Sequence, residues 1–213
     1  MLDKIYYANT SLVFNRDCEV KTVKQLDHQL FEVQSTHATF TCESLVVASG
    51  GLSIPTLGGS GIGYELAKQF DHQVFPTRAG LVPFTFSDQF KEVTTRLSGN
   101  ALEVTLSNDK NSFTEALLFT HRGLSGPSSL QLSNYWQAGE SFQINFFPTQ
   151  DLADYLKQKK QQQPKVLLRT LLSELTAKSI VLELQQLIWP NYAETAIAQL
   201  SDSNLEQIAA QLH

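Results

Sequence analysis

The order of apolar and polar positions divides the chain into a β-rich part and a helical part. Short apolar runs separated by polar breaks predict strands from about residue 5 to residue 148. The first three runs, within residues 13–48, follow one another closely and therefore predict an antiparallel meander. Further along, Leu102, Val104 and Leu106 alternate with other residues, which predicts a strand with these three side chains on one face.

The last part of the chain has the pattern of packed helices. Residues 151–213 are rich in Leu, Gln, Lys and Ala and contain no glycine. Apolar residues recur there at helical spacing, and Pro164 and Pro190 mark breaks between helices. The leucines between Leu167 and Leu175 form a stripe that predicts a hydrophobic core. Residues 201–212 begin with a serine or aspartate cap and predict a final helix.

A glycine-rich stretch, residues 43–64, is the feature around which the chain is organised. Leu45–Ala48 is a short apolar run that stops at two glycines, which predicts a buried strand leading into an open loop. Four more glycines follow within residues 58–63, and Tyr64–Phe70 has a helical pattern. A strand, a glycine loop and a helix start allow backbone N–H groups to approach a phosphate or a flat cofactor.

The spacing of these glycines matches no specific nucleotide motif. No Gly-Lys-Ser/Thr follows, as a Walker A loop requires, and no Gly-x-Gly-x-x-Gly occurs there. The alternative that the glycines only make turns therefore stays open at this point. A further hypothesis is that the chain is a complete small enzyme that binds a phosphate-bearing substrate at Gly58–Gly63.

A second loop, His121-Arg122-Gly123-Leu124-Ser125-Gly126-Pro127, also joins a predicted strand to a predicted helix. Ser125 is expected to cap that helix, and Pro127 suits its first turn. A serine-hydrolase elbow is excluded because Pro127 replaces its last glycine. His121 is the histidine placed at a strand end beside this turn, so it is the candidate for a direct role in proton transfer.

Arg78 lies between the two loops in sequence. A guanidinium at this place suits an anionic group of a substrate or cofactor, although a surface salt bridge is the commoner role of such a residue.

Composition narrows the classes of partner and compartment. The formal charge of −5 argues against nucleic acid or an anionic membrane as the main partner. The two cysteines, Cys18 and Cys42, are not spaced as a metal-binding pair and are expected to be free thiols, and no metal site is predicted. No membrane span or signal peptide is evident, so a cytoplasmic protein is expected.

Four segments together resemble a known family. They are LVVASGGLSIPTLGGSGIGYELAKQFDHQV, LVPF, LSG and LLFTHRGLSGPSSLQLS, in this order. In order and spacing they resemble the BaiN/YhiN-like bacterial flavoproteins, also called the aminoacetone oxidase family of FAD-binding enzymes. The resemblance covers nearly the whole chain, is strongest from Ser44 to Ser133, and is weaker in the helical tail.

The resemblance implies the middle piece of a larger FAD-dependent oxidoreductase with a two-dinucleotide-binding-type architecture. The implied fold is α+β, with an antiparallel meander, glycine loop and short helix on the FAD side over 1–70. A β-rich, barrel-like substrate-side domain follows over 71–150, and a helical subdomain over 151–213. The expected partners are a small-molecule substrate and the flanking FAD-binding segments, with NAD(P)H as a candidate electron donor. Isolated from those segments, the chain is expected to be inactive and to self-associate.

The resemblance also implies roles for individual residues. His121 is the catalytic candidate, and Thr120 and Arg78 are expected on the substrate side. The positions that match the FAD-contacting segments of the family are Ala48, Ser49, Gly50, Gly51, Gly58, Ser60, Gly61 and Gly63.

The chain departs from the family pattern at a few positions. Serine replaces threonine at Ser49, and Ile62 stands where an aspartate is usual, which weakens the expectation of polar contacts from that loop. Ala79-Gly80 replaces the common Pro-Ala. A non-enzymatic binding module on the same scaffold remains the alternative to an oxidoreductase.

Overall fold

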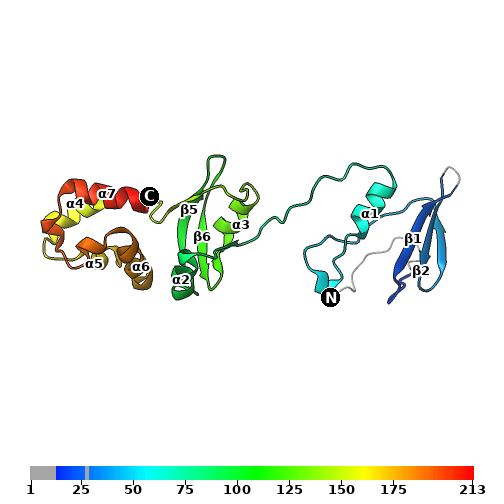
Figure 1. The fold of residues 1–213 in the computed structure, drawn as a ribbon, viewed down its shortest axis with the longest axis horizontal. Helices are drawn as coiled ribbons and strands as arrows, with labels where there is room; N and C mark the ends of the chain where they lie inside the picture. The colour runs from blue at the N-terminus through cyan, green and yellow to red at the C-terminus, as the bar shows by residue number, and fades with distance from the viewer. Residues whose placement is uncertain (1–12, 27–28) are drawn as a thin grey trace. The chain divides into compact units, whose positions relative to one another are not determined.

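The structure, a computed structural model, describes residues 13–26 and 29–213. They form two compact units, with the boundary between Thr77 and Arg78 (Figure 1). Both units combine an antiparallel sheet with helices, which confirms the expected α+β class. The strand residues expected between residue 5 and residue 12 lie outside the described residues. The finer division at residues 70 and 150 stays a prediction.

The first unit is built on the expected meander. Strands β1 (Val20–Gln25), β2 (Phe31–Ser35) and β3 (Thr39–Cys42) pair antiparallel in this order. After a short 3-10 turn, η1 (Pro55–Leu57), comes α1 (Ile62–Gln69). The Gln69 amide donates a hydrogen bond of 2.7 Å to the Val23 carbonyl and so holds α1 against β1.

This unit has almost no hydrophobic core of its own. Val23, at 4% exposed, is the only buried apolar side chain among its described residues. The predicted strand Leu45–Ala48 is wrong for this structure, because no strand is assigned there and Val46 is 84% exposed. An apolar run becomes a strand only when another strand offers hydrogen-bond partners, and the described residues supply none for it.

The second unit contains a five-stranded antiparallel sheet. Its strand order is β4-β7-β6-β5-β8. The strands are β4 (Phe84–Thr85), β5 (Ala101–Ser107), β6 (Ser112–Thr120), β7 (Gly123–Ser125) and β8 (Gln143–Asn145). Val104 and Leu106 are fully buried and Leu102 packs against them, which confirms the predicted face.

Two helices lie beside this sheet, α2 (Gln89–Arg96) and α3 (Pro127–Ser133). The sequence pattern did not suggest α2, whose Asp88 cap accepts a hydrogen bond from the Phe90 N–H. The expected cap of α3 is wrong: the capping residue is Gly126 rather than Ser125, and no side chain caps that end. Pro127 does occupy the first turn, as predicted, where its missing N–H costs no hydrogen bond.

The helical tail is confirmed. It comprises α4 (Leu152–Gln162), α5 (Leu168–Leu172), α6 (Lys178–Ile188) and α7 (Asp202–Leu212), with the short turns η2 (Pro190–Tyr192) and η3 (Ile197–Gln199). The leucines of α5 are buried, but Leu175, beyond its end, is 38% exposed and lies outside the core. None of the described helices is long and apolar enough to cross a membrane.

The sheet and the helical tail of the second unit share one hydrophobic cluster. At its border the Arg96 guanidinium of α2 forms a two-pronged ion pair with Glu183 of α6, at 2.7 and 2.8 Å. The Ser179 hydroxyl donates to the Asn100 side-chain oxygen at 2.9 Å nearby. These contacts make the tail part of the unit that carries the second loop.

Candidate functional site

The glycine loop of the first unit folds back on itself. The Gly59 N–H donates to the Ile54 carbonyl at 3.1 Å. A Cβ atom at Gly59 would lie 2.6 Å from the Gly51 carbonyl oxygen and 2.9 Å from that of Ile54. Only glycine allows two backbone segments to approach so closely. The structure thus brings Gly51 of the first glycine pair against Gly59 of the later group.

The start of α1 meets the same loop. A Cβ at Gly63 would lie 3.1 Å from the Ser49 hydroxyl, so this helix turn packs closely on the segment after Ala48. Gly61 is the N-cap of α1, and among the described residues no side chain caps this end of the helix. Uncapped N–H groups and the helix dipole favour an anionic ligand such as a diphosphate.

The remaining predicted positions of the loop are open. Gly50 and Gly58 have φ of +71° and +87°, and a Cβ at either would meet nothing within 4 Å. Ser60 is exposed. Their backbone is therefore accessible to a ligand, and the residues present fit the phosphate or ring edge of a dinucleotide cofactor.

Ile62 adds an apolar element beside the loop. Together with Val46, Ala48 and Ser49 it lines a cavity of about 270 Å³. An aspartate at this position would offer a carboxylate, whereas isoleucine extends the apolar surface of the segment after β3.

In the second unit, Thr120 is bound into the turn that carries His121. Its hydroxyl donates to the Gly123 carbonyl at 3.0 Å and accepts from the Arg122 N–H at 3.3 Å. The His121 ring is exposed, while its carbonyl accepts from the Thr95 hydroxyl at 3.2 Å. Thr120 therefore fixes the turn, and His121 is presented to solvent at its tip.

Strand β4 lies next to this turn. The Phe86 N–H donates to the Arg122 carbonyl at 3.0 Å, and Thr85 pairs with Gly123. Arg78 precedes β4, is exposed, and lines a cavity of about 690 Å³ that includes Phe84 and Phe86. Arg78 and the second loop thus flank one short strand, although no hydrogen bond or ion pair of the described residues joins Arg78 to His121.

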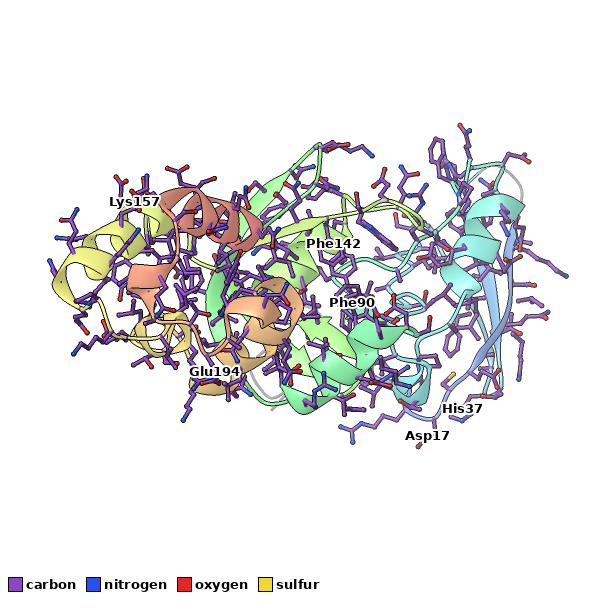
Figure 2. All side chains as sticks on the ribbon, turned by 60° about the vertical axis from the view of Figure 1, so that its left-hand side comes forward. Asp17, His37, Phe90, Phe142, Lys157 and Glu194 are labelled. Atoms are coloured by element: carbon purple, nitrogen blue, oxygen red, sulfur yellow. The ribbon has the colours of Figure 1, made fainter. Side chains whose placement is uncertain are left out.

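Sequence reasoning missed the aromatic residues of this cavity. Phe84 stacks on Phe142 with ring centroids 4.5 Å apart and meets Trp136 edge-on at 5.4 Å. Figure 2 labels Phe142 among the side chains of this unit. The only sequence signal was a tryptophan in the polar turn between α3 and β8. The ring that it contacts, Phe84, lies more than fifty residues upstream.

Comparison with known proteins identifies relatives of this chain. Residues 78–213 match the family described as HI0933-like protein barrel and H2TH domain. A protein of Haemophilus influenzae named ribosomal RNA dihydrouridine synthase is 41% identical over 176 residues, which is 82% of this chain and 44% of that protein. A protein of Escherichia coli with the same name is 40% identical over 199 residues, or 93% and 47%. The chain spans about half the length of the curated relatives it matches.

Proposed function

The chain belongs to the HI0933-like family, the family of the BaiN/YhiN-like flavoprotein-related proteins, and from this premise we propose that it is the central part of an FAD-dependent oxidoreductase. FAD would be bound with the help of the glycine loop, and NAD(P)H is the proposed electron donor. The observation that carries the proposal is the close packing at Gly59 beside the uncapped start of α1.

The flanking FAD-binding segments are the proposed partners of the first unit. Val46 is 84% exposed in an unpaired apolar segment, and the unit buries one apolar side chain among its described residues. A segment with unpaired N–H and C=O groups and exposed β-branched side chains suits pairing with a further strand. Without such a partner, self-association through this surface is expected.

Bound FAD would supply hydride transfer, and the residues of this chain would position the substrate and exclude water. His121 is the proposed proton donor or hydrogen-bonding group, because its exposed ring sits on a turn that Thr120 holds. Arg78 is proposed to face an anionic part of the substrate.

The names of the relatives suggest the substrate. We propose that the full-length protein reduces a uridine in ribosomal RNA to dihydrouridine, in place of an unidentified small organic substrate. Reduction of the uracil C5=C6 bond adds one hydride to one carbon and one proton to the other, which matches a flavin paired with a proton donor. This departs from the expectation of a partner other than nucleic acid, which rested on net charge alone.

FAD titration tests the cofactor assignment. We expect this chain alone to bind little FAD, and the protein with its flanking segments restored to bind it tightly, as followed by flavin fluorescence. In that protein Gly59→Ala should weaken FAD binding by about tenfold or more, because its Cβ forces the two glycine segments apart. Gly99→Ala, in the second unit with nothing within 4 Å of its Cβ, is the matched control and should leave the affinity unchanged.

Other results would select the alternatives. If restored flanking segments gave no FAD binding, the oxidoreductase assignment would be refuted in favour of a binding module. If phosphate alone raised the melting temperature of this chain, with no response to FAD, a phosphate-bearing substrate at Gly58–Gly63 would be the better interpretation.

A further inference from the structure

A cavity of about 690 Å³ in the second unit has a wall of aromatic rings. Phe84 and Phe142 stack on one another, and the Trp136 ring meets Phe84 at an interplanar angle of 83°. Phe84 is buried, whereas Trp136 and Phe142 are partly exposed and present ring surface to the cavity. The volume lies in the range of about 300–1,000 Å³ that is usual for small-ligand sites.

The Trp136 ring is held in place. Its indole N–H donates to the Glu140 carbonyl at 2.6 Å, and the Glu140 carboxylate accepts from the Gln137 N–H at 2.9 Å. The Lys110 ammonium group donates a hydrogen bond to that carboxylate at 2.8 Å. This hydrogen bond has the largest effect on the pKa of Glu140, which it lowers, and the hydrogen bond from the Gln137 N–H lowers it further. The carboxylate at this rim is therefore ionised but already paired, and the indole needs little reordering when it stacks on a ligand.

Polar groups stand at the rim beside these rings. Arg78 is exposed, and its charge helps to lower the pKa of Glu140, although among the described residues it forms no ion pair within 4.0 Å. Gln137 is exposed and offers both a donor and an acceptor. The aromatic rings, the Gln137 amide and the Arg78 guanidinium together complement one kind of ligand. It is a flat ring with hydrogen-bond donors and acceptors on its edge and a negative charge nearby.

The backbone that carries Arg78 is fixed to α3. The Leu81 N–H donates to the Asn134 side-chain oxygen at 3.1 Å, and the Val82 N–H donates to the Ser133 hydroxyl at 3.0 Å. Leu81 has φ of +52°, a strained conformation for leucine that costs about 1–2 kcal/mol. Strain that the surroundings maintain is typical of segments that position a binding group.

A second cavity in this unit lacks such chemistry. It measures about 500 Å³ and lies between α2, the sheet and α6, with a lining that is mostly apolar. Its one charged lining residue, Glu183, is paired with Arg96. Nothing there selects a ligand, whereas the aromatic cavity combines stacking surface, an amide and a cation.

We propose that the aromatic cavity is the subsite for an unpaired uracil base of the RNA strand, with the ring against Trp136 and the adjoining phosphate on Arg78. This inference rests on the proposed RNA substrate and adds the residues that would hold it. Bases in single-stranded RNA are commonly recognised by stacking on aromatic side chains, and arginine pairs with their phosphates. Stacking of this kind is sequence-tolerant, so the Gln137 amide is assigned to the edge of the base.

Tryptophan fluorescence provides the first test. The chain has two tryptophans, and Trp189 is 1% exposed, so a stacking ligand can reach only Trp136. We expect uridine 5′-monophosphate and an oligouridylate of about ten nucleotides to quench the emission of the full chain in a saturable manner. The absence of saturable quenching by the oligonucleotide would overturn the proposal.

Affinity for labelled oligouridylate, measured by anisotropy, provides the second test. Trp136→Leu should weaken binding by about tenfold or more, and Arg78→Gln should weaken it and reduce its dependence on salt. The controls are Tyr135→Leu, an exposed aromatic that stacks on Phe113 outside the cavity lining, and Lys165→Gln, an exposed cation of the helical tail. Both controls should bind within about twofold of the parent chain.

These outcomes separate the subsite from the FAD assignment. Unchanged RNA affinity in both Trp136→Leu and Arg78→Gln, with normal melting curves, would overturn the subsite even if FAD binds. The protein with its flanking segments restored could bind RNA through Trp136 and yet bind no FAD. This result would refute the proposed FAD-dependent oxidoreductase but not the RNA subsite. If the flanking segments abolish quenching by uridine 5′-monophosphate, protein covers the cavity and the proposal is also overturned.

Discussion

Gly126 and Gly99 share a φ of +91° but differ in what surrounds them. A Cβ at Gly126 would lie 2.6 Å from the Ala116 carbonyl oxygen and 2.9 Å from the Leu118 nitrogen, both in the backbone of β6. A Cβ at Gly99 would meet nothing within 4 Å. The pair of variants Gly126→Ala and Gly99→Ala therefore compares a crowded glycine of positive φ with an open one of the same φ.

The magnitudes follow from these surroundings. Gly99→Ala should lose about 1–2 kcal/mol of unfolding free energy, the cost of placing alanine at positive φ. Gly126 also has ψ of 167°, a region that is essentially restricted to glycine, which costs about 1–3 kcal/mol. Moving α3 away from β6 to admit the methyl group adds about 1–3 kcal/mol of overpacking. We expect Gly126→Ala to lose about 4 kcal/mol in total.

Urea unfolding of the full chain, followed by circular dichroism, measures both variants. The expected difference between them is about 2.5 kcal/mol, or about 5–10 °C in melting temperature for a chain of this length. The two variants must keep the slope of the parent, because a changed slope would indicate a different unfolded state. A difference below about 0.5 kcal/mol would refute the reasoning, since it would mean that α3 and β6 do not approach closely at Gly126.

Two further results are expected from the charges and the exposed surface. The hydrogen bond from Lys159, and then that from Tyr155, lowers the pKa of Glu174. The ionised Glu174 carboxylate therefore stabilises the folded protein at pH values above 4.5, the ordinary pKa of glutamate. This stabilisation is lost as the pH falls through the lower pKa that Glu174 has in the folded protein. Lys159→Gln should melt below the parent at pH 7, and this gap should close below pH 4.5, whereas a constant gap would contradict the assignment. Val46→Lys should reduce self-association of the chain in light scattering, and undiminished association would show that this apolar segment is not the contact.

The sequence by itself determined the features that depend on near neighbours. The alternation of Val104 and Leu106 specified a half-buried strand because side chains in a strand point to opposite faces in turn. Ser201 began the last helix as predicted, since it and Asn204 satisfy each other's backbone N–H groups within one turn. The glycine-rich stretch was also visible in the sequence, because a cluster of glycines within one short segment is a local feature. Its spacing matched no nucleotide motif, and the expected role in FAD binding came from the family resemblance.

Tertiary structure decided the features whose partners lie far away along the chain. Leu45–Ala48 has the composition of a strand but no pairing, because a strand forms only where another offers hydrogen bonds. The Trp136 cavity joins β4 with the turn after α3 and the approach to β8, residues that no local pattern relates. Sheet pairing and core packing bring these residues together. The free energy gained depends on apolar surfaces from distant parts of the chain, so no short segment of the sequence shows it.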